Sequence, residues 1–193
     1  MEFDQYAEQY DAGFMGKGST RFYRDLIREL EIRDGNAMLD VGCGTGTILE
    51  WIGKSKMIHG YGLDVSESMI TVAREKHPDY SFVTGDSALL PYADESMDVM
   101  MACMAYHHFP EQEKFRHEAW RVLKPGGSLY ICDPRFPAPV RWTLNTFFRD
   151  AGFRTAGENT KAFEGTGFST VKIVKDQYVQ VLHFEKRTED DRQ

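Results

Sequence analysis

Short apolar runs alternate with amphipathic stretches from residue 37 onward. Brief runs of apolar and β-branched residues predict strands, and apolar positions at helical spacing predict helices. The predicted strands are Ala37–Val41, Met57–Leu63, Tyr80–Thr84, Met97–Met104 and Ser128–Asp133. The predicted helices between them are Thr47–Lys54, Ser66–Lys76 and Glu111–Leu123. This alternation predicts an α/β fold in which helices cover both faces of a parallel sheet.

The residues before the first strand predict a helical cap. Phe3, Tyr6 and Tyr10 recur at near-helical spacing, and Ser19 to Ile32 has the pattern of an amphipathic helix. The glycine-rich stretch 13–18 lies between these two parts and predicts a hinge. Two interpretations of the stretch stay open, a mobile lid and an ordinary surface loop.

The chain after residue 133 has the least regular pattern. A helix is predicted over Val140–Ala151, and Phe168–Lys175 and Tyr178–Lys186 alternate like the strands of an antiparallel hairpin. We therefore expect a single domain over residues 1–193. Its predicted parts are an N-terminal cap (1–36), a core (37–133), a variable segment (134–167) and a terminal hairpin (168–186).

Composition and the first residues of the chain indicate in which cellular compartment the protein is expected. With 41% hydrophobic and 27% charged residues the chain has an ordinary globular composition, and no run approaches the ~18 apolar residues of a membrane span. Residues 1–4 include acids where a secretory signal carries basic residues. We expect a cytoplasmic protein that has no membrane partner.

Charge and cysteine content argue against two kinds of site, a nucleic-acid interface and a zinc site. The net charge is −7, and the densest basic cluster is Lys54-Ser55-Lys56, so a nucleic-acid partner is not expected. The three cysteines, Cys43, Cys103 and Cys132, are too few and too widely spaced for a zinc site. We expect no metal and three buried free thiols.

Three glycines at alternate positions follow the first predicted strand, namely Gly42, Gly44 and Gly46. Without a Cβ the backbone can turn sharply and approach a ligand closely. A dinucleotide-binding loop carries its third glycine one residue later. No Lys or Arg lies in this loop to bind a phosphate, so the spacing favours another nucleotide-like ligand.

Polar residues also follow the other strands, at the sheet edge where ligands of open α/β sheets bind. They are Asp64, Asp86-Ser87, the stretch Cys103 to His108, and Asp133. Asp64 lies eighteen residues after Gly46, where a carboxylate can accept hydrogen bonds from ribose hydroxyls. The alternative for Asp64 is a favourable charge at the start of the helix that Ser66 caps.

Together these stretches resemble the successive motifs of class I S-adenosylmethionine-dependent methyltransferases. The motifs are Leu39–Gly46, Asp64, Gly85-Asp86-Ser87 and Arg121–Gly127. The resemblance covers about residues 37–133 and is greatest to small-molecule enzymes related to the ubiquinone and menaquinone C-methyltransferases. It implies a Rossmann-like, doubly wound sheet of seven strands, mostly parallel with an antiparallel C-terminal edge strand. It also implies S-adenosyl-L-methionine as cofactor and a small-molecule substrate.

The resemblance assigns cofactor-binding positions as well. They are Asp40, Gly42, Cys43 and Gly44 at the methionine part, Asp64 at the ribose, Val65 and Met69 near the adenine, Asp86 and Ser87 at its amino group, and Cys103 after the fourth strand. Carboxylates accept hydrogen bonds from hydroxyls, amines and an ammonium group, whereas a phosphate requires donors. The chemistry of these residues therefore agrees with the cofactor.

Three residues are candidates for catalysis. Tyr10 belongs to a segment resembling the Phe-Asp-x-x-Ala-x-x-Tyr-Asp opening of related enzymes, where its ring would cover the cofactor's cationic sulfur, although plain packing is an alternative. His107 and His108 follow the fourth strand, and one of them can act as a general base. The alternative for each histidine is a structural hydrogen bond that shapes the pocket.

Five residues of the variable segment are expected to line the substrate pocket, with surface packing as the alternative: Arg135, Phe136, Arg141, Trp142 and Phe147. A second function also stays open, an S-adenosylmethionine-binding regulatory or partner protein without methyl transfer. A nicotinamide-dependent oxidoreductase is disfavoured by the glycine spacing. The sequence leaves the acceptor and the oligomeric state undetermined.

Overall fold

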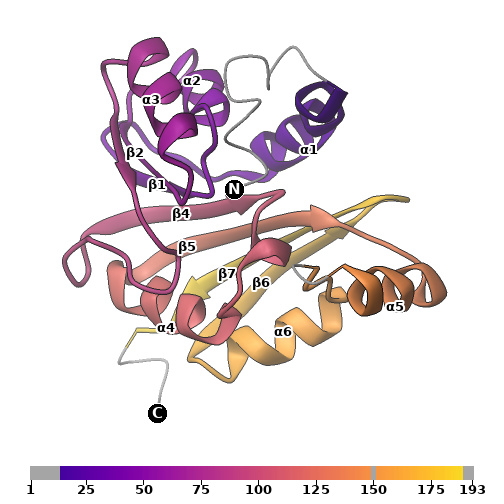
Figure 1. The fold of residues 1–193 in the computed structure, drawn as a ribbon. Coiled ribbons are helices and arrows are strands. Elements are labelled where there is room, and N and C mark those ends of the chain that lie inside the picture. The colour runs from indigo at the N-terminus through magenta and orange to yellow at the C-terminus, as the bar shows by residue number, and fades with distance from the viewer. Residues whose placement is uncertain (1–13, 149–150, 189–193) are drawn as a thin grey trace.

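The structure, a computed structural model, describes residues 14–148 and 151–188 (Figure 1). Its helices are α1 (Phe14–Glu29), α2 (Thr47–Gly53), α3 (Glu67–Lys76), α4 (Gln112–Val122), α5 (Ala138–Phe147) and α6 (Ala156–Glu164), with a short 3₁₀ helix η3 (Tyr106–His108). Its strands are β1 (Ala37–Val41), β2 (His59–Asp64), β3 (Ser81–Thr84), β4 (Met97–Cys103), β5 (Leu123–Pro134), β6 (Phe168–Lys175) and β7 (Val179–Lys186).

The seven strands form one sheet in the order β3-β2-β1-β4-β5-β7-β6. Strands β1 to β5 run parallel, and β7 is antiparallel to both β5 and β6. The α/β fold with seven strands and an antiparallel C-terminal strand is therefore confirmed. β7 lies inside β6, so β6 forms the outer edge. The strand order reverses between β1 and β4, and their carboxyl ends flank the crevice where such sheets bind ligands.

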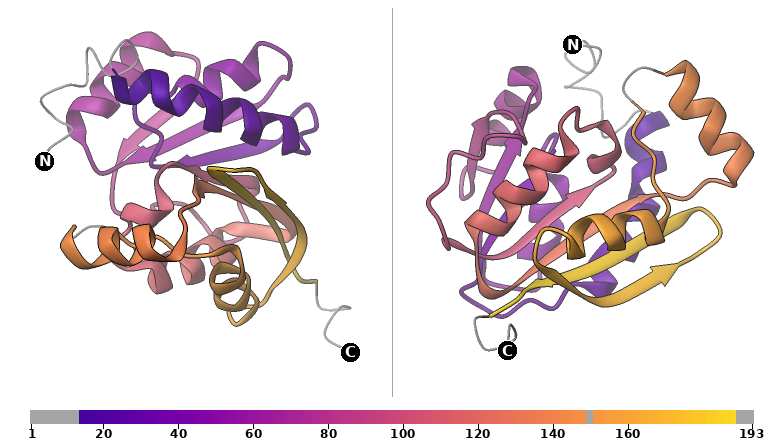
Figure 2. Two further views of the ribbon diagram at one scale, coloured as in Figure 1. Left: turned by 90° about the vertical axis from the view of Figure 1, so that its right-hand side faces the viewer. Right: turned by 90° about the horizontal axis from the view of Figure 1, so that it is seen from below.

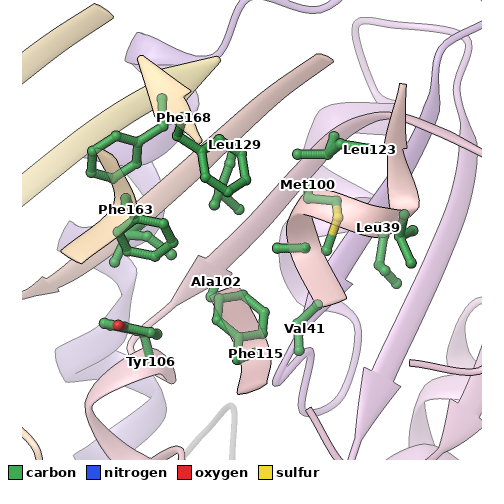
Figure 3. Close-up of a cluster of buried hydrophobic side chains, with 14 of the residues drawn as sticks. Leu39, Val41, Met100, Ala102, Tyr106, Phe115, Leu123, Leu129, Phe163 and Phe168 are labelled. Carbon is green, nitrogen blue, oxygen red and sulfur yellow. The ribbon is translucent and has the colours of Figure 1, made fainter. Parts of the chain in front are cut away.

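Helices cover both faces of the sheet, as expected. Helices α1, α2 and α3 lie on one face and α4 and α6 on the other (Figures 1 and 2). Alternate residues of β1 supply both cores, since Met38 packs in the cluster with α1 and α2, whereas Leu39 and Val41 pack in the cluster with α4. Figure 3 shows the second cluster, which the buried rings of Phe115 and Phe163 share with Tyr106.

Two helices differ from those predicted from the sequence. α1 begins at Phe14, so residues 14–18 are helical, and the hinge or loop expected there is wrong. Isolated glycines cost a helix only about 1 kcal/mol each relative to alanine, which the apolar packing of α1 through Leu26 offsets. α6 was not expected at all. Its start carries a capping box, in which Thr155 and Glu158 exchange hydrogen bonds with each other's backbone.

Two further elements agree more closely with the pattern. Ser66 caps α3 as expected, because its hydroxyl accepts a hydrogen bond from the Met69 amide at 3.3 Å. The helix expected over Val140–Ala151 corresponds to α5, which begins two residues earlier and ends at Phe147. None of the residues of α5 is buried. α5 therefore adds no buried side chain to the core of the domain.

Candidate functional site

The loop after β1 is shaped by its three glycines. The backbone angle φ is 79° at Gly42, 52° at Gly44 and 81° at Gly46, a left-handed conformation that other residues rarely adopt. The amides of Gly42 and Cys43 donate to the Leu63 carbonyl over 2.7 and 3.1 Å. These bonds hold the loop against the end of β2.

Space also restricts two of these glycines. A Cβ at Gly42 would lie 2.4 Å from the Cβ of Ala105, and one at Gly46 would lie 2.8 Å from the ring of Phe82. Gly44 differs, because no described atom lies within 4 Å of its Cβ position. A ligand can therefore reach bare backbone at Gly44.

The carboxylate of Asp40 lies buried at the end of β1. Its side chain is 1% exposed, and neither oxygen has a hydrogen-bond partner among the described residues. Burial, with a smaller contribution from the negative charge of Asp64, raises the pKa of Asp40 to about 8. A buried carboxylate without donors is costly, so this position suits a ligand that brings a positive charge.

The carboxylate of Asp64 connects the glycine loop with the start of α3. One oxygen accepts from the Gly44 amide at 2.8 Å, and the other accepts from the Ser66 amide at 2.9 Å. A carboxylate accepts about four hydrogen bonds. Asp64 can therefore order the loop and also accept from hydroxyl groups of a ligand.

The loops after β2 and β3 present apolar surface beside a carboxylate. Val65 is 53% and Leu89 is 76% exposed, and these loops follow adjacent parallel strands. Asp86 is exposed, and its side chain accepts from the Ala88 amide at 2.9 Å. Such surroundings suit a planar ring with an amino group. The side chains of Met69 and Ser87, expected at the same ring, are buried.

The thiols of Cys43 and Cys103 are buried, and burial raises the pKa of both well above the usual range. The sulfur of Cys43 lies 2.8 Å from the Cβ position of Gly62, so this side chain packs against β2. Cys103 lies in the same apolar cluster and pairs in register with Cys132 of β5. Both thiols fill the core, which leaves their backbone for contact with a ligand.

The two histidines after β4 lie in different environments. The ring of His107 is buried, and its Nδ1 lies 2.8 Å from Oδ1 of the equally buried Asp133. Phe153 stacks on His107 with ring centroids 4.4 Å apart, and the ring of His108 lies 4.0 Å away. His108 itself is exposed. The third catalytic candidate, Tyr10, lies outside the described residues.

Of the residues expected to line the substrate pocket, Phe136 lies near His107. Its ring packs edge-on against Phe153, the ring that stacks on His107, with centroids 5.0 Å apart. Arg135 instead donates to the Asp176 carbonyl, and Arg141 pairs with Glu158 at 2.8 Å. Trp142 and Phe147 are 67% and 73% exposed. These four residues lie on α5 or bond to the β6–β7 turn, so their place in a substrate pocket stays a prediction beside the alternative of surface packing.

Sequence reasoning missed other residues near the histidines. They are Phe153, Gln112, Arg116 and Arg154, which line or border a pocket beside His107. Gln112 and Arg116 are four residues apart on α4, a spacing that could have placed them on one face. Phe153 and Arg154 lie in a segment without regular structure, where no periodicity signals them.

The described residues contain neither a membrane-spanning helix nor a cluster of metal ligands. Within residues 14–148 and 151–188, no helix combines the length and apolar character needed to cross a membrane. In the same ranges, no three potential metal-ligating side chains of His, Cys, Asp or Glu gather into one group.

Comparison with known proteins identifies the family. Residues 39–131 match the methyltransferase domain family. The chain is 31% identical over 169 residues to the demethylmenaquinone methyltransferase of Chlorobaculum parvum, covering 83% of this chain and 70% of that protein. It is 33% identical over 137 residues to methyltransferase GfsG of Streptomyces halstedii, covering 68% of this chain and 48% of that protein. The chain thus spans about half the length of several curated relatives it matches.

A solved structure corrects the expected partners. A chain from the complex between the Haloferax volcanii Trm112 methyltransferase activator and a methyltransferase superposes with a TM-score of 0.86 at 21% identity. The alignment covers 97% of this chain and 98% of that one. The sequence-based partner set held a small-molecule substrate, excluded nucleic acid and membranes, and included no protein. That set is wrong in leaving out a protein partner, since a protein of this fold is found with an activator.

The family and cofactor inferred from the motifs are confirmed by these matches. The Asp40 carboxylate and the open backbone at Gly44 also fit the ammonium-bearing methionine part of that cofactor. The chain belongs to the class I S-adenosylmethionine-dependent methyltransferases, an enzyme family whose cofactor is S-adenosyl-L-methionine.

Proposed function

We propose that this chain transfers a methyl group from S-adenosylmethionine to a small-molecule acceptor. The observation that carries the proposal is the buried, unpartnered carboxylate of Asp40 beneath the glycine loop. The cofactor supplies an electrophilic methyl group on a positively charged sulfur. We further propose that residues 1–193 act as one domain, with the cap, core, variable segment and hairpin described above.

Each part of the cofactor has a proposed set of contacts. Asp40 and the backbone of Gly42, Cys43 and Gly44 bind the methionine part, and Asp64 accepts from the ribose hydroxyls. Val65 and Met69 contact the adenine, Asp86 and Ser87 bind its polar edge, and Cys103 closes the site after β4. The support is chemical. The carboxylates can accept hydrogen bonds from the hydroxyl and amine groups of the cofactor, and the exposed side chain of Val65 offers apolar surface to the adenine ring.

The buried His107–Asp133 pair supports a general base on the acceptor side. A carboxylate only accepts hydrogen bonds, so the bond to Asp133 places a proton on Nδ1 of His107. Nε2 then carries the lone pair that removes a proton from the acceptor as its nucleophilic atom attacks the methyl group. His108 borders the same place, and Tyr10 is proposed to cover the cofactor's sulfur. A general base contributes about 10²–10⁴-fold in rate.

We also propose that the chain binds a protein activator. The support is the match to a methyltransferase-fold chain that forms a complex with the Trm112 activator. Co-purification of this chain with the Trm112 protein of its host, measured by light scattering after gel filtration, tests the proposal. A 1:1 complex supports it, and elution of two separate species contradicts it.

Calorimetric titration with S-adenosylmethionine and its demethylated product tests cofactor binding. Asp64→Ala is expected to weaken binding at least about tenfold, since hydrogen bonds to a charged group contribute about 1.5–3 kcal/mol. Asp79→Ala, an exposed aspartate between α3 and β3, is the matched control and should leave affinity unchanged. Absence of binding to the unmodified chain overturns the proposal.

Transfer of a labelled methyl group into the small-molecule fraction of a cell extract tests the reaction. Label in one or more compounds supports methyl transfer. Cofactor binding without transfer to any fraction instead supports the regulatory function.

A further inference from the structure

A pocket of about 930 Å³ opens beside the His107–Asp133 pair. It lies between the first turns of α4 and residues 151–154, and it begins at His107 and His108. Arg116 and Arg154 line it from these two sides, and His117 adds a third imidazole. The methyl-transfer chemistry proposed above leaves both arginines without a role.

The two guanidinium groups have no carboxylate partner within the described part of the chain. Arg116 donates to the hydroxyl of Tyr106 at 3.2 Å, and its Nε is buried without a hydrogen-bond partner. Arg154 donates from Nε to the amide oxygen of Gln112 at 2.6 Å. Both positive charges therefore rest on neutral acceptors, where an anion would gain strong charge-assisted hydrogen bonds.

Gln112 fixes this arrangement before any ligand arrives. Its side chain is 8% exposed, and its Nε2 donates to the carbonyls of Tyr106 and Gly152 over 3.0 and 3.1 Å. The remaining oxygen accepts from Arg154, so all three bonds set one orientation of the amide. A preformed orientation of Arg154 lowers the entropy cost of binding.

The acidic residues of the pocket do not neutralise these arginines. Glu111 pairs with Lys114 at 2.7 Å, so those two charges cancel. Glu113 is exposed in the first turn of α4 and forms no ion pair with the described residues. The pocket thus keeps an excess of positive charge in a chain whose net charge is −7.

We propose that this pocket binds a carboxylate or phosphate group of the methyl acceptor through Arg116 and Arg154. The proposal rests on the proposed function and deepens it, because it names an anionic acceptor. The anion at the arginines holds the acceptor so that its nucleophilic atom lies near Nε2 of His107. The arginines are positioning and specificity residues, which take no proton during the reaction.

Titration of inorganic phosphate and of acetate into the chain saturated with S-adenosylhomocysteine, at low ionic strength, tests the inference. We expect saturable binding of at least one anion by calorimetry. Arg154→Gln and Arg116→Gln are each expected to weaken it about tenfold or more, since each removes a charge-assisted contact. The stronger of the two anions indicates whether the acceptor carries a phosphate or a carboxylate.

Arg24→Gln is the matched control, because Arg24 lines a separate basic groove between α1 and α2. It should bind the anion like the unmodified chain. Arg116→Gln removes a contact with the core residue Tyr106, so the exposed Arg154 decides the outcome if Arg116→Gln does not fold. Equal anion affinity in Arg154→Gln and the unmodified chain, or no saturable binding, overturns the inference.

The two proposals fail separately in this design. Binding of S-adenosylhomocysteine without anion binding leaves the methyltransferase function standing and removes the anionic acceptor. Anion binding without binding of S-adenosylhomocysteine removes the proposed function instead.

Discussion

Nδ1 of His107 lies 2.8 Å from Oδ1 of Asp133, with both side chains buried at the carboxyl ends of adjacent parallel strands. The register of β4 and β5 brings them together, because Cys103 at the end of β4 pairs with Cys132, the residue before Asp133, and η3 with His107 is the next element after β4. Phe153 covers one face of the imidazole. The carboxylate and the stacked ring therefore hold the imidazole in one orientation before an acceptor binds, and they favour the tautomer that carries its proton on Nδ1.

Replacement of Asp133 by Asn should lower methyl transfer about 10²-fold or more, because the proton on Nδ1 of His107 loses its carboxylate acceptor. The affinity for S-adenosylhomocysteine should not change. Nitrogen NMR of the imidazole gives a second measurement that needs no acceptor. We expect the Nδ1-protonated tautomer in the unmodified chain and a mixture in Asp133→Asn. An unchanged tautomer together with unchanged transfer would show that Asp133 does not position His107.

Cofactor binding should release a proton near neutral pH. The pKa of Asp40 is raised to about 8, so the carboxyl is mostly protonated below that pH in the free protein. The cofactor's ammonium group favours the ionised carboxylate and displaces the proton. Affinity should therefore rise by up to about tenfold per pH unit between pH 6 and 8.

Calorimetry in buffers with different ionisation enthalpies measures this proton release. Asp40→Asn cannot release a proton, so its weaker binding should not depend on buffer or on pH in this range. Equal heats in all buffers for the unmodified chain would contradict the assignment of the ammonium to Asp40.

The same substitution should stabilise the protein in the absence of cofactor. The folded chain holds the Asp40 proton up to pH of about 8, whereas the unfolded chain loses it near 3.8, the ordinary pKa of an aspartic acid. Stability therefore falls as pH rises between these values, because the folded state binds more protons. Each pKa unit corresponds to about 1.4 kcal/mol, so Asp40→Asn should raise the free energy of unfolding at pH 8 by at least about 1 kcal/mol.

Urea denaturation at pH 5 and pH 8 checks this prediction. The gain from Asp40→Asn should be clearly smaller at pH 5, where the native carboxyl is already neutral. A loss of stability at pH 8 would mean that Asp40 has a structural partner.

Comparison of Gly44→Ala with Gly126→Ala should separate the loss of cofactor contact from the cost of backbone strain. Gly44 and Gly126 both have left-handed φ values, 52° and 73°, and both face open space at the Cβ position. Either alanine should cost about 1–2 kcal/mol of stability. Gly126 lies in β5 before the strand's buried part, so only Gly44→Ala should weaken binding of S-adenosylhomocysteine.

Thermal melting measures the stability of the two variants, and calorimetry measures their affinity for S-adenosylhomocysteine. Similar losses of melting temperature with a selective loss of affinity in Gly44→Ala are expected. Equal affinities in both variants would place the cofactor away from the glycine loop.

Much of the core could be predicted from local patterns. β1, with its alternation of Met38 and Leu39 between two cores, and the cap at Ser66 depend on neighbours within a few residues. The left-handed glycines are likewise a local property, because only the missing Cβ permits their φ values. The start of α1 could not be predicted, since packing through Leu26 outweighs the poor helix propensity of glycine.

The sequence by itself determined the alternation of strands and helices, the glycine loop and the carboxylates at the strand ends, and with them the family and its cofactor. Only the tertiary structure decided that Asp40 lacks a partner, that His107 pairs with Asp133 and that Arg116 faces the same pocket as Arg154. These relationships join residues that are distant along the chain, and strand register and helix packing create them. Hydrophobic periodicity carries no information about which polar side chains meet.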